Sequence, residues 1–248
     1  MNTNKRTSTK TILLVIILAC VILRLGVALY LGDSTPPGKD ETSYSELAER
    51  LSEGYGYSFE RPWYPGFVPA DTPTSHWSFL YTGFVAAVYS LFGEHPLTVR
   101  LLSALISGIL MPIMLYRLSR RVWPQRDQLA LLTAALGAIY AYFVLFGAMV
   151  QTEAFFIIAV VWSLERSLAL LALYKNPAAT RSNYLLAALT LGISLGLATL
   201  LRQSILPWAA LSFLLLLLAG WKHKQFENAL VSLFIAGLTL LAFILPFT

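Results

Sequence analysis

Long uncharged stretches alternate with short polar segments along almost the whole chain. A helix of about 20 residues crosses the hydrocarbon core of a bilayer, which is about 30 Å thick. The pattern therefore predicts an all-α polytopic membrane protein. The runs with little or no charge cover residues 12–31, 77–93, 101–116, 129–150, 154–174, 184–201, 203–221 and 228–248.

The distribution of basic residues favours seven crossings, with 77–93 excluded and the N-terminus in the cytoplasm. This topology places eleven of the 18 Lys and Arg residues inside and five outside, as the positive-inside rule requires. Counting 77–93 as a crossing reverses the ratio, and starting outside would export the basic N-terminal tail. The cations expected inside are Lys5, Arg6, Lys10, Arg117, Arg120, Arg121, Arg126, Lys175, Arg181, Lys222 and Lys224.

Charged residues inside the predicted crossings are few. The first run has the character of an uncleaved signal anchor, because it is longer than the apolar part of a secretory signal. We expect Arg24 in this run to snorkel toward the membrane surface and Cys20 to be a small buried hydrophobic residue. Glu165 and Arg166 are adjacent, so we expect their side chains to point in different directions and not to pair.

Composition agrees with a membrane protein. Hydrophobic residues make up 57% of the 248 and charged residues 12%, whereas soluble domains average about 25% charged. In a membrane protein, the net charge of +5 reports loop orientation rather than nucleic-acid binding. The sequence also contains no Gly-rich nucleotide loop and no cysteine pair.

Residues 32–93 are predicted to form a long outer loop that carries interfacial helices. Ser43 and Glu46 have the spacing of a capping box. An apolar periodicity follows and predicts a short amphipathic helix lying along the membrane. The segment 77–93 is predicted to be a second interfacial helix. The apolar positions of the first helix are Tyr44, Leu47, Ala48 and Leu51.

Asp40 and Glu41 lie directly before this first helix. A carboxylate at the lipid–water boundary can accept a proton from a hydroxyl group, although acids before a helix also complement its dipole. The segment 60–76 is rich in proline and aromatic residues. These fit either a rigid groove for a sugar or an interfacial aromatic belt.

Several segments of the chain, taken in order, resemble the protein-mannosyltransferase and aminoarabinose-transferase branch of GT-C glycosyltransferases, the glycosyltransferase family 39 type. The resemblance covers essentially the whole chain. It rests on Asp40-Glu41 with Tyr44, Ala48, Leu51 and Gly54-Tyr55-Gly56-Tyr57, on Tyr81, Leu91-Phe92-Gly93, Arg100-Leu101-Leu102-Ser103 and residues 116–121, and on Gln151-Thr152-Glu153 and residues 195–202.

The resemblance implies transfer of a sugar from a polyprenyl-phosphate donor, with inversion at the anomeric carbon, on the outer face of the membrane. Asp40 matches the catalytic base, and Glu41 is either a supporting residue or a solvated neighbour. Glu153 matches an acidic residue that orients the acceptor or a metal, or it is an acid at a helix N-terminus. Arg202 either binds the departing phosphate or closes a helix C-terminus.

Arg61, Arg100 and Lys39 are weaker phosphate-binding candidates, each with an interfacial anchor as the alternative. His76 is assigned to the substrate-binding region, as polar packing rather than as a metal ligand. We predict no cofactor firmly, and a divalent metal stays possible. The expected partners are the lipid-linked donor, membrane lipids and a protein, lipid or glycan acceptor.

Residues 1–248 are expected to form one transmembrane domain that is incomplete at its C-terminus, because family members usually continue with further membrane helices. The predicted location is a bacterial inner membrane, in the cell envelope. The competing hypothesis is a non-enzymatic membrane scaffold or a small transporter. The few ionisable residues within the runs argue against a proton-coupled transporter.

Overall fold

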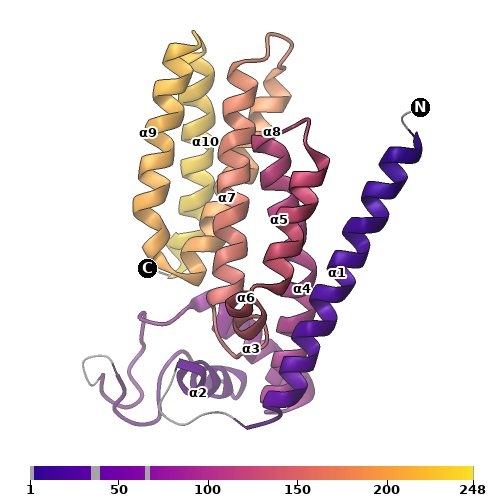
Figure 1. The fold of residues 1–248 in the computed structure, drawn as a ribbon. Helices are drawn as coiled ribbons and strands as arrows, with labels where there is room; N and C mark the ends of the chain where they lie inside the picture. The colour runs from indigo at the N-terminus through magenta and orange to yellow at the C-terminus, as the bar shows by residue number, and fades with distance from the viewer. Residues whose placement is uncertain (1–2, 35–39, 65–67, 248) are drawn as a thin grey trace. The chain divides into compact units, whose positions relative to one another are not determined.

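The computed structural model describes residues 3–34, 40–64 and 68–247, without the side chains of residues 3–7. Its secondary structure there is helical apart from two isolated antiparallel bridges, Ser58 with Pro73 and Trp63 with Val68. The predicted all-α class is confirmed. The helices in Figure 1 are α1 (Thr3–Leu31), α2 (Asp40–Ser52), α3 (Phe79–Phe92), α4 (Pro96–Val122), α5 (Asp127–Ile139), α6 (Ala141–Phe146), α7 (Glu153–Tyr174), α8 (Arg181–Leu201), η1 (Gln203–Ile205), α9 (Leu206–Lys222), α10 (Phe226–Ile244) and η2 (Leu245–Phe247).

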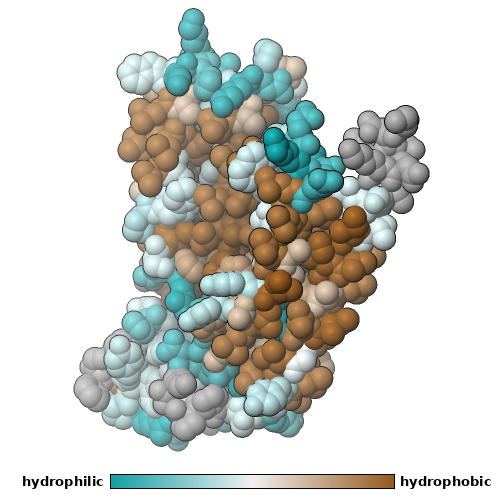
Figure 2. Space-filling model, viewed as in Figure 1, coloured by the Kyte–Doolittle hydropathy of each residue, from teal (hydrophilic) through white to brown (hydrophobic). Residues whose placement is uncertain are grey.

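Six helices among the described residues are long and apolar enough to cross a membrane. Hydrophobic side chains cover much of the visible surface of α1, as Figure 2 shows. Helix α3 has 14 residues and reaches about 21 Å, which agrees with its exclusion from the crossings. The six candidate spans are Ser8–Leu31, Pro96–Val122, Glu153–Tyr174, Arg181–Leu201, Gln203–Lys222 and Phe226–Phe247.

The seventh predicted crossing, residues 129–150, is divided between two helices. Helix α5 ends at Ile139, Tyr140 is extended with φ −63° and ψ 119°, and α6 begins at the next residue. The 13 residues of α5 reach only about 20 Å. This run contains no proline, so it carries no strong sequence signal for the interruption.

Arg24 does not snorkel, which corrects the expectation for this residue. Its side chain is fully buried, and Nη1 donates to the carbonyl oxygen of Ala138 at 3.2 Å and to that of Cys20 at 3.3 Å. Ala138 lies in the last turn of α5, where carbonyl groups have no helical partner. Arg24 therefore stabilises the end of α5, and Cys20 is buried as predicted.

The chain divides into two compact parts. The first comprises Met1–Ile113 and Ala134–Phe155, and the second Met114–Thr133 and Phe156–Thr248. In the first part, a Cβ added to Gly108 of α4 would lie 2.8 Å from Cγ2 of Val21 in α1. Small residues allow such close approach between membrane helices. A single domain over residues 1–248 stays a prediction.

In the second part, α8 and α10 also pack closely through glycine. A Cβ on Gly192 of α8 would lie 2.5 Å from Cβ of Thr239, and one on Gly196 would lie 2.7 Å from the Phe243 ring. The two glycines are four residues apart and so lie on one face of α8. This small-residue spacing is typical of membrane helix interfaces.

Glu165 in α7 pairs with Arg166, which corrects the expectation that these neighbours do not interact. The carboxylate is buried, and it also accepts from Nη2 of Arg121 in α4 at 2.9 Å. Arg117 lies 3.7 Å away. One buried carboxylate is thus surrounded by several guanidinium groups, which compensates the cost of burying its charge.

Candidate active site

Asp40 is the first residue of α2, and its side chain is exposed. The predicted apolar face of this helix is confirmed, because Tyr44, Leu47 and Ala48 are buried. The predicted capping box is wrong. Ser43 lies inside the helix, and its Oγ accepts a hydrogen bond from a tryptophan Nε1 of the following loop at 2.9 Å. The helix therefore includes the Asp40-Glu41 pair in its first turn.

Glu41 is buried, with 1% of its surface exposed, and is not a solvated neighbour of Asp40. Its Oε1 accepts from Nη2 of Arg100 at 3.2 Å and from the backbone amide of Val150 at 2.7 Å. These contacts join the start of α2 to α4 and to the segment before α7. The backbone that carries Asp40 is therefore held by the side chain of the next residue.

Arg100 is also buried, at 1% exposure, and its contacts place it in the framework of the site. Besides Glu41, it donates from Nη1 to the carbonyl oxygens of Gly32 and Ser34, both at 2.8 Å. These carbonyls follow the end of α1. The guanidinium thus joins three segments and does not face solvent, where a phosphate would approach.

The start of α4 is fixed to the same region by Asp33. This carboxylate accepts from the backbone amide of Leu97 at 2.9 Å and lies 3.1 Å from Nδ1 of His95. The bond to the Leu97 amide, followed by the His95 contact, lowers the pKa of Asp33. The carboxylate acts as a cap on the first turn of α4, where amides lack helical partners.

Helices α2 and α3 pack through aromatic and hydroxyl groups. The Ser45 and Tyr89 hydroxyls share a hydrogen bond of 2.5 Å, and burial raises the pKa of Tyr89 to about 12. The Tyr44 ring meets Trp77 and Tyr81 edge-on at 5.3 and 5.4 Å. Such contacts add to the area that aromatic residues bury and give α2 a rigid support.

Arg61 lies along the side of α2 rather than at its start. It donates to Oε1 of Glu46 at 2.6 Å, and its guanidinium lies 4.7 Å from the centre of the Trp63 ring. The side chain is 63% exposed. Arg61 is therefore accessible to an anionic ligand, although both contacts already stabilise its charge.

His76 is exposed and lies among aromatic rings at the N-terminal approach to α3. Its ring meets Tyr64 and Trp77 edge-on, at 6.3 and 5.4 Å. Among the described residues, no group of three or more His, Cys, Asp or Glu side chains could hold a metal ion. Asp40 and the described residues around it thus do not form such a group.

Glu153 begins α7, three residues after the amide that binds Glu41. It belongs to the same compact part as Asp40, Glu41, Arg61, His76 and Arg100. Arg202 follows α8 in the second part, with φ −153° and ψ 121°. The structure brings together the segments of Glu41, Arg100 and Glu153, while Lys39 lies outside the described residues.

The segment before α7 contributes more than sequence reasoning assigned to it. The backbone carbonyl of Met149 accepts from the Tyr81 hydroxyl at 3.4 Å, and Gln151 and Thr152 are buried. The motif Gln151-Thr152-Glu153 contributes to the family resemblance in the sequence, but only Glu153 has a predicted role in the site. The Val150 amide carries the contact to Glu41, and no side-chain pattern could reveal it.

The long apolar helices define the class as a polytopic membrane protein with a fold of GT-C type. A solved structure shares this fold: the archaeal oligosaccharyltransferase AglB from Archaeoglobus fulgidus, in complex with an inhibitory peptide and a dolichol-phosphate. The TM-score is 0.75 at 19% identity, over 100% of this chain and 30% of that one. The chain thus spans less than a third of that protein.

The family is shown by sequence. A model of the family described as dolichyl-phosphate-mannose-protein mannosyltransferase matches residues 77–248, so the chain belongs to this family. The predicted resemblance is confirmed. The match does not include α2, and Asp40 and Glu41 therefore lie outside it. No curated protein matches the chain.

Proposed function

We propose that the chain carries the donor-side catalytic part of a glycosyltransferase that moves a sugar from a polyprenyl-phosphate to a protein, lipid or glycan acceptor. The reaction takes place at the outer face of the membrane, with inversion at the anomeric carbon. Membership of the mannosyltransferase family supports the reaction class. The dolichol-phosphate and peptide in the AglB complex support a lipid-phosphate donor and a protein acceptor.

The observation that carries the assignment of Asp40 is the contrast with its neighbour. Asp40 is exposed at the first position of α2, whereas Glu41 is buried and bound to Arg100 and to the Val150 amide. A general base needs access to the substrate and a fixed position. The exposure of Asp40 supports the first requirement, and the buried contacts of Glu41 support the second.

In the proposed step, a carboxylate oxygen of Asp40 accepts the proton of the acceptor hydroxyl. The acceptor oxygen forms a bond to C1 of the sugar while the bond from C1 to the phosphate oxygen breaks. The electron pair of that bond leaves with polyprenyl phosphate, so charge develops on the phosphate. Arg61 is the exposed cation that we assign to this phosphate, because guanidinium groups bind phosphate through paired hydrogen bonds. Phosphate binding by Arg202 stays a prediction from the sequence.

Glu41 and Arg100 are positioning residues in this proposal, because neither side chain is exposed. Glu153 is assigned to acceptor binding, since it begins α7 next to the segment bound by Glu41. His76 and the rings around it line the acceptor or sugar side, where aromatic faces pack against sugar rings. The N-terminus is placed in the cytoplasm of a bacterial cell, with α2 outside the inner membrane.

The test is transfer or hydrolysis of a panel of polyprenyl-phosphate sugars in proteoliposomes. It compares the chain and the full-length gene product, each with and without Asp40→Asn. Glu60→Gln is the matched control, because Glu60 is an exposed carboxylate of the same loop. Loss of a general base costs about 10²–10⁴-fold. We expect that loss for Asp40→Asn in a folded protein and less than about twofold for Glu60→Gln.

Equal turnover in Asp40→Asn and in the unsubstituted protein would overturn the assignment of the base. Absence of turnover with every donor, even in the full-length product, would favour the scaffold or transporter hypothesis. A KM effect without a kcat effect for Arg61→Gln would place that residue in binding rather than in leaving-group stabilisation. The sugar that supports turnover identifies the donor.

A further inference from the structure

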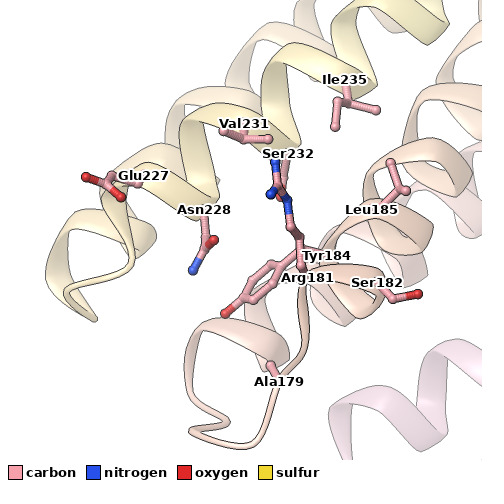
Figure 3. Close-up of a pocket in the computed structure, with 10 residues that line it drawn as sticks. All are labelled: Ala179, Arg181, Ser182, Tyr184, Leu185, Glu227, Asn228, Val231, Ser232 and Ile235. Carbon is pink, nitrogen blue, oxygen red and sulfur yellow. The ribbon is translucent and has the colours of Figure 1, made fainter.

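A pocket of about 770 Å³ opens between the first turns of α8 and α10, within the second part of the chain. Figure 3 shows side chains of both helices facing this space. The pocket lies at the end of α8 and α10 that carries the loops predicted to be cytoplasmic. Its lining consists of Ala179, Arg181, Ser182, Tyr184, Leu185, Glu227, Asn228, Val231, Ser232 and Ile235.

The packing of α8 against α10 explains why the pocket exists. The two helices run in the same direction, because Gly192 lies against Thr239 while the pocket joins residues 181–185 to residues 227–235. At Gly192 an added Cβ would lie 2.5 Å from the facing side chain. The helices are in tight contact at that level and leave open space toward their N-termini.

The mouth of the pocket holds polar groups that lack partners. Arg181 is exposed and makes no hydrogen bond or ion pair with the residues that the structure describes. The hydroxyl of Ser232 is buried and has no hydrogen-bond partner in the described chain. In Figure 3 the Arg181 side chain extends toward α10, while the carboxylate of Glu227 points away from it.

The N-terminus of α10 adds positive potential at the same place. Its N-cap residue, Gln225, makes no side-chain cap bond, and its Oε1 instead accepts from Nδ2 of Asn228 at 2.7 Å. The first amides of a helix carry a partial positive charge that favours anions. With Arg181, this helix end makes the mouth complementary to a single anionic group.

The remainder of the pocket is apolar and open. Val231 is 51% exposed and Leu185 46%, and Ile235 lies one turn further along α10. Lys222 and Lys224 line a neighbouring hollow. A polar, positively charged end that continues into an exposed apolar channel matches the chemistry of a lipid with an anionic headgroup.

We propose that this pocket binds one anionic phospholipid. The phosphate contacts the Arg181 guanidinium and the Ser232 hydroxyl, and one acyl chain lies along Leu185, Val231 and Ile235. Free phosphate would leave the apolar side chains uncovered. A zwitterionic lipid would bring a second, positive charge close to the Arg181 guanidinium. The proposal does not depend on Asp40 or on the transfer reaction.

The experiment measures retention of lipid on the full chain by native mass spectrometry in a zwitterionic detergent. The probes are palmitoyl-oleoyl phosphatidylglycerol and the corresponding phosphatidylcholine. Arg181→Gln removes the cation, and Val231→Trp fills the apolar channel from an exposed position. Lys175→Gln is the charge-matched control, because Lys175 is exposed in the loop before α8 and does not line the pocket.

We expect Arg181→Gln to reduce retention of phosphatidylglycerol by at least about fivefold, and Lys175→Gln by less than about twofold. The unsubstituted chain should retain phosphatidylglycerol more tightly than phosphatidylcholine, and Val231→Trp should abolish the tight retention of phosphatidylglycerol while helical content stays unchanged. Equal losses in Arg181→Gln and Lys175→Gln would show diffuse attraction to basic loops and overturn the proposal. Unchanged retention in Val231→Trp, or displacement of the lipid by inorganic phosphate, would also overturn it.

Discussion

Removal of the Glu41 carboxylate should destabilise the protein far more than loss of an exposed charge. In Glu41→Ala, Arg100 keeps two backbone carbonyl partners but loses its only carboxylate among the described residues, and the Val150 amide loses its acceptor. A buried guanidinium without a counter-charge cannot be solvated by water at 1% exposure. The change therefore leaves an uncompensated charge and an unsatisfied donor.

The magnitude follows from burial and distance. At 3.2 Å and an effective dielectric constant of about 20, the attraction between Glu41 and Arg100 is about 5 kcal/mol before desolvation. Breaking a buried pair by removing one partner costs about 3–5 kcal/mol. The Arg61–Glu46 pair has side chains 63% and 28% exposed, so we expect about 0–1 kcal/mol for Arg61→Ala.

The assay is reversible unfolding by SDS in mixed micelles, followed by circular dichroism. The double variant Glu41→Gln/Arg100→Met removes both charges and keeps an acceptor for the Val150 amide, so it should lose less stability than Glu41→Ala. With the single variants Glu41→Gln and Arg100→Met, the double variant completes a double-mutant cycle, which should give a favourable coupling energy between the two residues. A loss in Glu41→Ala no larger than that in Arg61→Ala would refute the reasoning.

Two further predictions concern the packing of α10 and one acid of α2. Gly192→Ala should cost about 1–3 kcal/mol by SDS unfolding, because its Cβ meets α10 at 2.5 Å. Gly237→Ala, with its nearest neighbour at 3.7 Å, should be neutral or stabilising, and equal losses would contradict the close approach. Burial, followed by Glu94, raises the pKa of Glu49 above its usual 4.5. The folded state then binds more protons than the unfolded chain, so stability falls as the pH rises above about 4.5. Glu49→Gln should raise Tm at pH 7 and change it little at pH 4, and an equal shift at both would exclude this cause.

Local periodicity predicted the elements of the site better than their boundaries. The spacing of Tyr44, Leu47 and Ala48 gave the buried face of α2, because side chains three and four residues apart share one side of a helix. The predicted start of that helix is wrong. Ser43 resembles an N-cap in sequence, but it lies inside the helix and accepts a hydrogen bond from the Trp63 indole. A cap depends on backbone conformation, which residue types alone do not determine.

Contacts between distant segments could not be predicted from the sequence. Arg100 and Glu41 are 59 residues apart, and Arg24 meets the carbonyl of Ala138 across 114 residues. The local sequence predicts a phosphate ligand or an interfacial anchor for Arg100 and snorkelling for Arg24. Both are instead buried where a helix end exposes backbone carbonyls. A guanidinium carries five donors, so it can satisfy several such carbonyls at once.

The first turn of α2 shows how two adjacent carboxylates come to have different environments. Successive side chains on an α-helix are separated by about 100°, so when Glu41 points into the protein, Asp40 is directed elsewhere. The contacts of Glu41 with Arg100 and Val150 thereby fix the direction of Asp40 without touching its side chain. A base that must meet a mobile acceptor needs open space around its carboxylate, and precise placement must then come from the backbone. In the proposed reaction, the carboxylate that reacts and the carboxylate that positions it lie on neighbouring residues, so exchanging them would place each one where its proposed chemistry does not fit.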